Sequence, residues 1–247
     1  MTEQITLVVT SCGRLNLLQQ TLRSFLKFNA YPIAEGIIIE DSGKLDLRAL
    51  LSIECPFPMK IIQNETNLGQ IKSVDTAYAQ VKTPYIFHCE DDWEFFKPGF
   101  IEASLDILKQ DQKVFCVWLR AYSDTNNHKI ERLPHGHYNY MALNFDRLWH
   151  GFTFNPGLRR TSDCMRLHPY SHLEVLVKKK PMLLGEVDLS GYYKMLGYRA
   201  AISNDEEGYV RHIGYEDHIE LPYESNMLLR PQYKEPIKKA LRSLGLR

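Results

Sequence analysis

The sequence lacks any long hydrophobic run: no stretch of about eighteen apolar residues, the length that a membrane-spanning helix needs, occurs in its 247 residues. Its first residues also lack the basic and apolar segments of a secretory signal. We therefore expect a cytoplasmic protein. Residues 234–247 mix apolar and basic side chains with helical spacing. This end is a candidate for peripheral contact with an anionic membrane, although packing on the protein's own body is the favoured alternative.

Cysteine is scarce, with five residues, an odd number, and no Cys-x-x-Cys pair. This pattern argues for reduced thiols and against a disulfide framework or a zinc site built on paired thiols. Charge of one sign is also missing, since 30 basic side chains balance 30 acidic ones. A nucleic-acid partner is therefore not expected. Gly-x-Gly-x-x-Gly does not follow the first expected strand, and Gly-x-x-x-x-Gly-Lys-Ser/Thr is absent, so a nucleotide site must be built in another way.

Short apolar runs alternate with segments of helical periodicity in the first half of the chain. Continuous apolar strands separated by amphipathic helices are typical of a parallel sheet with helices on both faces. The less periodic second half is rich in His, Tyr, Asn and Arg, and we expect it to close over the sheet within one compact unit. The expected strands are residues 5–9, 36–39, 59–62, 85–89, 114–119 and 199–202. The strand at 114–119 is expected to complete the parallel sheet. The expected helices are residues 15–28, 45–51, 70–81, 99–109 and 188–196.

Polar residues follow the expected strands at the point where each strand ends. The segments are Thr10-Ser11-Cys12-Gly13, Glu40-Asp41-Ser42-Gly43, residues 64–69 and Glu90-Asp91-Asp92. In an open parallel sheet the carboxyl ends of the strands form the edge where ligands bind. We therefore expect the four segments to converge on one cleft.

Three consecutive carboxylates, Glu90-Asp91-Asp92, end the fourth of these strands. Adjacent carboxylates repel one another, so a folded protein keeps three together mainly where a cation compensates them. The sequence therefore predicts a divalent metal site. The alternative is an acidic turn that points into water.

The order and spacing of these segments resemble the GT-A nucleotide-sugar glycosyltransferases, most closely those of the family-2 type. The resemblance is good over residues 4–120 and patchier over residues 154–214. It implies a Rossmann-like, mostly parallel α/β sheet with helices on both faces and a less regular C-terminal half. Residues 1–120 would then bind the nucleotide-sugar donor, and residues 121–247 would bind the acceptor and supply the catalytic base.

The resemblance also assigns roles at the donor side of the cleft. It places the donor's base or ribose on Asp41 and a Mn²⁺ or Mg²⁺ ion, bridging the two phosphates, on the last carboxylate of the acidic triplet. The triplet begins with Glu, which departs from the common Asp. For His212 a contact with the metal or diphosphate is weighed against a hydrogen-bonded core role. The expected donor-binding residues are Thr10, Ser11, Arg14, Asp41, Asn67, Gly69, Lys72, Glu90 and Asp91, and the expected metal ligands are Asp92 and His212.

Acceptor chemistry needs a base that takes the proton of a hydroxyl group, and a carboxylate suits this task. The segment Gly185-Glu186-Val187-Asp188-Leu189 resembles the family's Glu-Asp-x-Asp-Leu element, with Gly-Glu in place of Glu-Asp. Glu186 is the preferred catalytic base and Asp188 the second candidate. The alternative is that both carboxylates only cap a helix.

Three further residues are candidates for contact with the acceptor or a phosphate. Asn155 lies in an Asn-Pro-Gly turn signal, and Arg159 follows it. Trp93 comes directly after the acidic triplet. For Arg159 the alternative is a solvated basic turn, and for Trp93 it is a buried anchor.

The sequence thus predicts a metal-dependent, inverting glycosyltransferase of cell-surface polysaccharide or glycolipid synthesis, with a UDP-sugar as the favoured donor and a carbohydrate or lipid-linked sugar as acceptor. Inversion is what the family-2 resemblance implies, and it follows from a single positioned base that acts opposite the leaving diphosphate. The sequence offers no dedicated nucleophile, which makes a covalent retaining route less attractive. A sugar-phosphate nucleotidyltransferase is the first alternative, disfavoured by the single glycine after the first strand. The second is a non-catalytic nucleotide- or carbohydrate-binding module.

Overall fold

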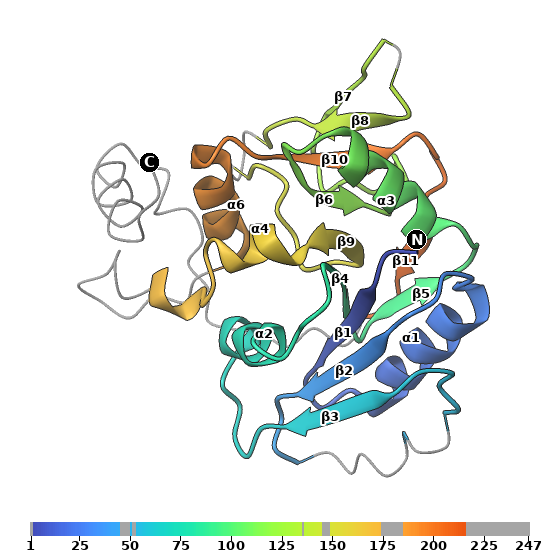
Figure 1. Ribbon diagram of the computed structural model, residues 1–247, viewed down its shortest axis with the longest axis vertical. Helices are drawn as coiled ribbons and strands as arrows, with labels where there is room; N and C mark the ends of the chain where they lie inside the picture. Colours follow the sequence, from blue (N-terminus) through green and yellow to red (C-terminus); the bar gives the residue numbers. More distant parts are fainter. Residues whose placement is uncertain are drawn as a thin grey trace.

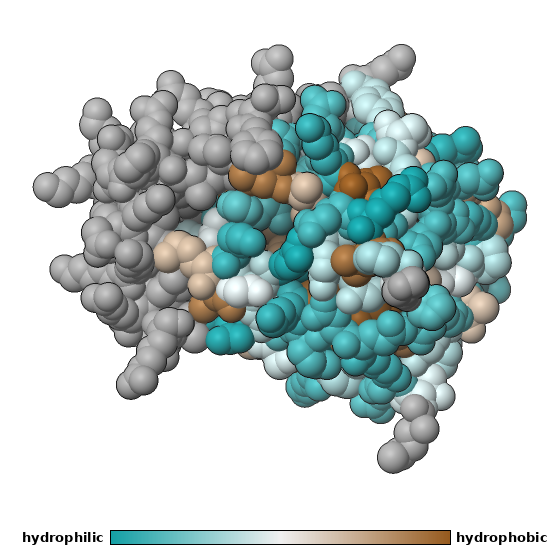
Figure 2. Space-filling view, turned by 90° about the horizontal axis from the view of Figure 1, so that it is seen from above, coloured by the Kyte–Doolittle hydropathy of each residue, from teal (hydrophilic) through white to brown (hydrophobic). Residues whose placement is uncertain are grey.

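The computed structural model describes residues 2–44, 50, 53–134, 136–144, 149–173 and 185–215. The expected helix at 45–51, apart from Leu50, and the amphipathic end at 234–247 lie outside these residues. No helix in the described ranges is both long and apolar enough to cross a membrane. The exposed surface in Figure 2 is mainly hydrophilic, and its hydrophobic spots are small and separate.

A mostly parallel sheet forms the N-terminal half (Figure 1). Its first four strands run parallel, and the fifth pairs with its neighbour in the antiparallel sense. The expected α/β fold with a mostly parallel sheet is therefore confirmed. In spatial order the strands are β3 (Met59–Gln63), β2 (Glu35–Glu40), β1 (Ile5–Ser11), β4 (Tyr85–Glu90) and β9 (Gly157–Arg160).

Helices cover both faces of this sheet, as the alternation of side chains along its strands requires. Leu7 and Val9 pack with α1 (Leu15–Phe28) and α3 (Phe100–Gln110), whereas Val8 packs with α2 (Gln70–Tyr78). Figure 1 shows α1 and α2 on opposite sides of β1 and β2. Both faces of β1 are thus buried, which explains its continuous apolar run.

A second sheet lies beside the first and contains β6 (Val114–Trp118). The expectation that 114–119 completes the parallel sheet is therefore wrong, because β9 occupies the position next to β4. The sequence of β9 is Gly-Leu-Arg-Arg, and the two buried arginines hide its strand character. In spatial order the second sheet is β6, β10 (Arg199–Ser203), β8 (Tyr138–Met141) and β7 (Ile130–Glu131), with β10 parallel to β6 and antiparallel to β8.

A short antiparallel pair joins the far end of the described chain to the acidic triplet. Strand β11 (Val210–His212) pairs with β5 (Trp93–Phe95), and the register sets His212 opposite Trp93. Two further helices complete the C-terminal half, α4 (Thr161–Met165) and α6 (Glu186–Met195). The pairing of β11 with β5 therefore brings a histidine from the second half to the carboxylates of the first.

Phe87 on β4 is fully buried and contacts the rings of Phe25, Phe95 and Phe100 at centroid distances of 5.5, 6.0 and 5.4 Å. We expect Phe87→Ala to lower the free energy of unfolding by about 3–5 kcal/mol, since a cavity replaces the ring. Urea unfolding measures this loss. The control Ile61→Ala, on β3 with 37% of the side chain exposed, should cost much less, and equal losses would contradict this packing.

Candidate active site

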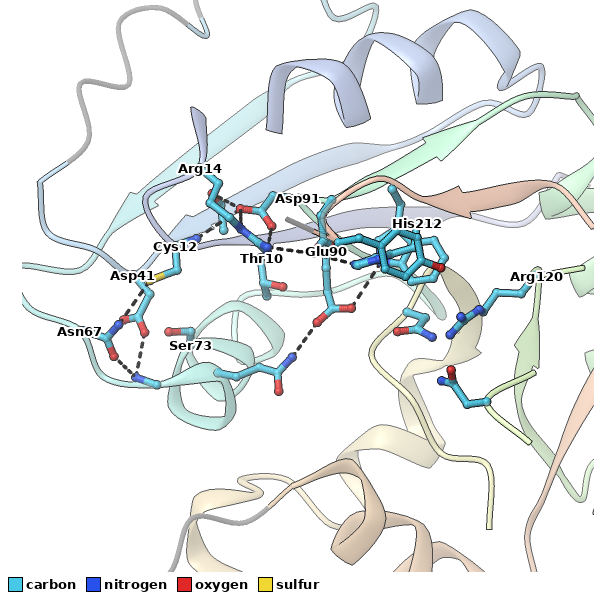
Figure 3. A pocket seen from close by; sticks show the side chains of 18 residues that line it. Thr10, Cys12, Arg14, Asp41, Asn67, Ser73, Glu90, Asp91, Arg120 and His212 are labelled. Carbon is cyan, nitrogen blue, oxygen red and sulfur yellow. Dashed lines mark hydrogen bonds and ion pairs between the residues drawn. The ribbon is translucent and has the colours of Figure 1, made fainter. Parts of the chain in front are cut away.

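A cavity of about 560 Å³ opens at the carboxyl ends of β1, β2 and β4. This volume is in the range of small-molecule sites. Figure 3 shows Asp41 and Asn67 at one end, Arg120 at the other, and Glu90 and His212 between them. Its lining includes twelve of the residues expected from the sequence, namely Thr10, Ser11, Arg14, Asp41, Asn67, Gly69, Glu90, Asp91, Asp92, Trp93, Asn155 and His212.

Asp91 faces the loop after β1. Its Oδ2 accepts a hydrogen bond of 2.8 Å from Ser11 Oγ, and its carboxylate forms an ion pair with Arg14. Only 1% of its side chain is exposed. Burial raises the pKa of Asp91, although Arg14 opposes this effect. Asp91 therefore fixes the loop after β1 to the acidic triplet.

Asp92 faces the C-terminal half. Its Oδ2 lies 3.2 Å from His212 Nε2 and 2.9 Å from Arg14 Nη1. Burial alone would raise the pKa of Asp92, but the hydrogen bond to His212 and the charge of Arg14 hold it below its ordinary value. Its Oδ1 is buried and has no hydrogen-bond partner among the described residues. An ionised carboxylate with an unsatisfied buried oxygen has room for one more electropositive group.

Glu90 faces the centre of the cavity. Its Oε1 accepts a bond of 2.8 Å from Gln70 Nε2, and Trp93 Nε1 lies 3.4 Å from its Oε2. With the Asn155 amide oriented by its hydrogen bonds, the Nδ2 donates to Glu90 Oε2 at 3.2 Å and the Oδ1 accepts from Arg120 Nη1 at 3.1 Å. Burial and the charges of Asp92, Glu186 and Asp91 raise the pKa of Glu90 well above its usual range. Of the triplet, Glu90 is thus the carboxyl group that most readily carries a proton.

Asp41 at the end of β2 organises the loop before α2. Its Oδ1 accepts from Asn64 Nδ2 at 2.7 Å and from Leu68 N at 2.8 Å, and its Oδ2 accepts from Gly69 N at 2.7 Å. Gly69 has φ 84°, which favours glycine, and Gln70 begins the helix. The N-terminal end of α2 consequently borders the cavity, where its free N–H groups favour an anion.

Glu186 and Asp188 begin α6 and do not line the cavity in the described structure. Glu186 Oε1 accepts bonds from Thr153 Oγ1, at 3.0 Å, and from Phe154 N. Asp188 Oδ2 accepts from Gly185 N at 3.0 Å, which is the helix-capping role considered for it in the sequence. Glu186 lies close enough to Glu90 for its charge to raise that group's pKa. Of the two, Glu186 is the one placed toward the cavity.

Arg159 and Lys72 are not brought to the cavity. Only 1% of Arg159 is exposed, and its guanidinium donates to Tyr78 Oη and to the Thr153 carbonyl inside the core. The expected phosphate or acceptor contact is therefore corrected, and so is the alternative of a solvated turn, because Arg159 lies on β9, a buried strand that pairs with β4. Lys72 is exposed on α2 outside the cavity lining.

The remaining lining residues were not expected from the sequence, although Cys12 lies within the predicted polar segment. Arg120 lies after β6, stacks 5.1 Å from the ring centre of Trp93 and forms an ion pair with Asp124. Tyr215 is 63% exposed and packs edge-on against His212 at 4.5 Å. Neither belongs to a motif; Arg120 directly follows the expected strand 114–119, and no sequence signal marks Tyr215. The full additional set is Cys12, Gln70, Ser73, Arg120, Asn126 and Tyr215.

A donor loop at the end of a parallel sheet, next to an acidic triplet that meets a C-terminal histidine, defines a GT-A type site. The family model for glycosyl transferase family 2 matches residues 6–165, and the chain belongs to this family. No curated protein matches the chain in sequence.

Solved structures show the same fold at low sequence identity. TarS from S. aureus, residues 1–349, has a TM-score of 0.57 at 15% identity, and the match covers 84% of this chain and 59% of that one. The same TarS fragment is also solved in complex with UDP-GlcNAc, with a TM-score of 0.57, 14% identity and coverages of 87% and 62%. The mannosyltransferase PcManGT from Pyrobaculum calidifontis, in complex with GDP-Man and Mn²⁺, has a TM-score of 0.60 at 13% identity, with coverages of 83% and 56%. The chain thus spans less than two thirds of the length of these structures.

We expect Asp41→Ala to weaken binding of a nucleoside diphosphate about tenfold or more, because the loop before α2 loses three hydrogen bonds to a charged acceptor. Calorimetric titration measures the change in Kd. The matched control is Glu65→Ala, which removes an exposed carboxylate from the same loop outside the cavity lining. Equal affinity in the wild type and Asp41→Ala would contradict this role of Asp41.

Proposed function

We propose that this chain transfers a sugar from a nucleoside-diphosphate sugar to an acceptor hydroxyl, with the help of a divalent metal ion and with inversion at the anomeric carbon. The observation that carries the proposal is the orphaned Asp92 Oδ1, buried beside His212 at the end of the donor loops in a family-2 chain. A UDP-sugar is the favoured donor. The titles of the TarS and PcManGT structures, which name UDP-GlcNAc and GDP-Man, support a donor of this class.

Asp92 and His212 fit a Mn²⁺ or Mg²⁺ site. One offers an unsatisfied carboxylate oxygen and the other an imidazole nitrogen, and oxygen-rich sites of this kind take most other ligands from phosphates and water. The described residues contain no cluster of three or more His, Cys, Asp and Glu side chains placed to hold an ion, which agrees with a site shared with the substrate. When bound, the ion supplies positive charge that offsets the charge on the departing diphosphate.

The residues around the diphosphate position act as fixed donors. Arg14 is held between Asp91 and Asp92, and the N-terminal end of α2 borders the same space. Groups already oriented before the reaction stabilise developing negative charge without a reorganisation cost. Asp41 and Asn67 at the far end of the cavity lie where the base or ribose of the donor would bind (Figure 3).

The acceptor enters from the side of Arg120, Asn155 and Tyr215. An exposed tyrosine beside planar polar groups suits the face and hydroxyls of a sugar. Glu186, which is hydrogen-bonded to Thr153 and Phe154 beside Asn155, takes the proton of the acceptor hydroxyl as that oxygen bonds to the anomeric carbon. The nucleoside diphosphate leaves from the opposite face with the electrons of the broken bond, and this single displacement inverts the configuration. The acceptor is a carbohydrate or lipid-linked sugar of surface polysaccharide or glycolipid synthesis. We place the protein in the cytoplasm.

Calorimetric titration with UDP, GDP, CMP and dTDP, each with and without Mn²⁺, tests donor and metal together. We expect one nucleotide, with UDP favoured, to bind only when Mn²⁺ is present, because the triplet repels an unaccompanied diphosphate. Asp92→Ala should abolish this metal-dependent binding. The control Asp106→Ala removes an exposed carboxylate from α3 and should bind as the wild type does. Absence of binding to every nucleotide would overturn the proposed function.

Replacement of Glu186 by Gln tests the base. We expect Glu186→Gln to lower kcat about 10²-fold or more, the usual contribution of a general base, while nucleotide affinity stays unchanged. Turnover is followed by release of the nucleoside diphosphate. Asp188→Asn is the control, since it should lower stability through the helix cap and keep most of the activity. A large loss in Asp188→Asn with an active Glu186→Gln would transfer the role to Asp188.

A further inference from the structure

Arg159 is a cation buried in the core without a carboxylate ion-pair partner among the described residues. Its Nη1 donates to Tyr78 Oη at 3.1 Å and its Nη2 donates to the Thr153 carbonyl at 3.0 Å. Its Nε has no hydrogen-bond partner among the described residues. The rings of Phe152 and Phe154 lie 5.6 and 5.9 Å from the guanidinium carbon. A buried and unpaired charge is destabilising. An apolar side chain would fill the core at lower cost, so packing alone does not account for an arginine here.

The guanidinium holds one particular turn, residues 153–155. Its bond to the Thr153 carbonyl fixes the first residue of the turn. The Thr153 hydroxyl and the Phe154 amide both donate to Glu186 Oε1, and the Asn155 amide group reaches Glu90. The turn therefore links the buried cation on β9 with Glu186 on α6 and with the acidic triplet.

The groups that surround Arg159 are neutral near pH 7. Burial lowers the pKa of His88 well below its usual range and raises the pKa of the thiols of Cys116 to about 12 and Cys164 to about 11. Tyr78 and Tyr170, also buried, have raised pKa values. None of these five groups therefore offsets the charge of Arg159 near pH 7.

Glu186 feels charges from several elements. The pKa of Glu186 lies above its ordinary value because burial raises it, and the hydrogen bonds from Phe154 and Thr153, followed by the charges of Arg159 and Arg120, oppose this rise. Glu90 at the end of β4 faces it with a negative charge when ionised, and Asp188 lies two residues further along the same helix. Loss of the Arg159 charge would consequently favour the protonated form of Glu186.

We propose that Arg159 is a positioning residue for the transfer reaction, which fixes the turn at residues 153–155 from within the core and so holds Glu186 oriented and ionised. The role rests on the proposed function, in which Glu186 is the base. Arg159 does not touch the substrate. It acts through Thr153 and through its charge.

The pH dependence of kcat in Arg159→Met and Arg159→Lys tests this role, with release of the nucleoside diphosphate as the measurement. In Arg159→Met we expect a lower kcat and an unchanged KM for the donor. The rising limb of the plot of kcat against pH should move to higher pH by about one unit, because an opposite charge near a carboxylate lowers the carboxylate's pKa by one to three units and this variant loses that charge. Arg159→Lys keeps the charge and should keep the limb of the wild type. Its kcat should still fall, because one ammonium group does not reproduce the fork of a guanidinium.

Arg160→Met is the matched control. Arg160 is the next residue of β9, is also buried, and bonds the Val114 carbonyl and Asp163 on the other face of the strand. Its loss should lower the Tm in a similar way and leave the rising limb where it is in the wild type. If the rising limb of the pH profile lies at the same pH in Arg159→Met and Arg160→Met, the proposed role of Arg159 is overturned and Arg159 is only a structural residue.

A carboxyl ¹³C NMR titration of Glu186, assigned by its loss in Glu186→Gln, gives a readout that needs no substrate. Arg159→Met should raise the titration midpoint, and an unchanged midpoint would overturn the inference. If Arg159→Met does not fold, the titration is repeated on Thr153→Val, which removes the hydroxyl that donates to Glu186. We then expect a higher titration midpoint for the Glu186 carboxyl group in Thr153→Val than in the wild type. Absence of turnover in the wild type with every donor would overturn the proposed function, while the titration still decides whether Arg159 controls Glu186.

Discussion

Compensation of three consecutive carboxylates is the constraint on which the site depends. The members of the triplet have partners on several segments. Asp91 contacts Ser11 at the end of β1, Glu90 contacts Gln70 on α2, and Asp92 contacts His212 on β11. Arg14, after β1, pairs with both Asp91 and Asp92. Because like charges so close together are tolerated only when these partners are in place, the triplet fixes the segments relative to one another. The same interactions that make the triplet stable therefore determine the shape of the cavity.

Two strand pairings supply the partners. The parallel register of β1 with β4 sets Thr10 beside Glu90, and the antiparallel register of β5 with β11 sets His212 beside Trp93. After β11 the chain passes so close to the triplet that a Cβ on Gly214 would lie 2.7 Å from Asp92 Cβ. Only glycine fits this approach without a shift of the neighbouring atoms. The geometry around Asp92 thus requires both halves of the chain, although the acidic triplet itself lies wholly in the first.

The part of the site that follows regular strands was predictable, and the part built by long-range pairing was not. Apolar runs followed by polar residues located the ends of β1, β2 and β4, because that pattern is local in the sequence. The strand β9 was not predicted, and Arg159 was wrongly predicted to contact a phosphate or the acceptor or to lie in a solvated turn. A strand of Gly-Leu-Arg-Arg gives no apolar signal, and its arginines donate to distant carbonyl and hydroxyl groups. Arg120 and Tyr215 belong to no motif, and only the fold brings them to the cavity.

The charges of the described lining residues argue for a cation that arrives with the substrate. Four carboxylates, Asp41, Glu90, Asp91 and Asp92, face two guanidinium groups, Arg14 and Arg120. Arg120 is also paired with Asp124, and Arg14 with Asp91 and Asp92, so carboxylates already balance the positive charge of both guanidinium groups. A proton on Glu90, favoured by its raised pKa, removes one negative charge and does not reverse the balance. This balance supports the proposal that a dianion binds this cavity together with a divalent ion, and the Asp92 oxygen that has no hydrogen-bond partner among the described residues is the proposed ligand.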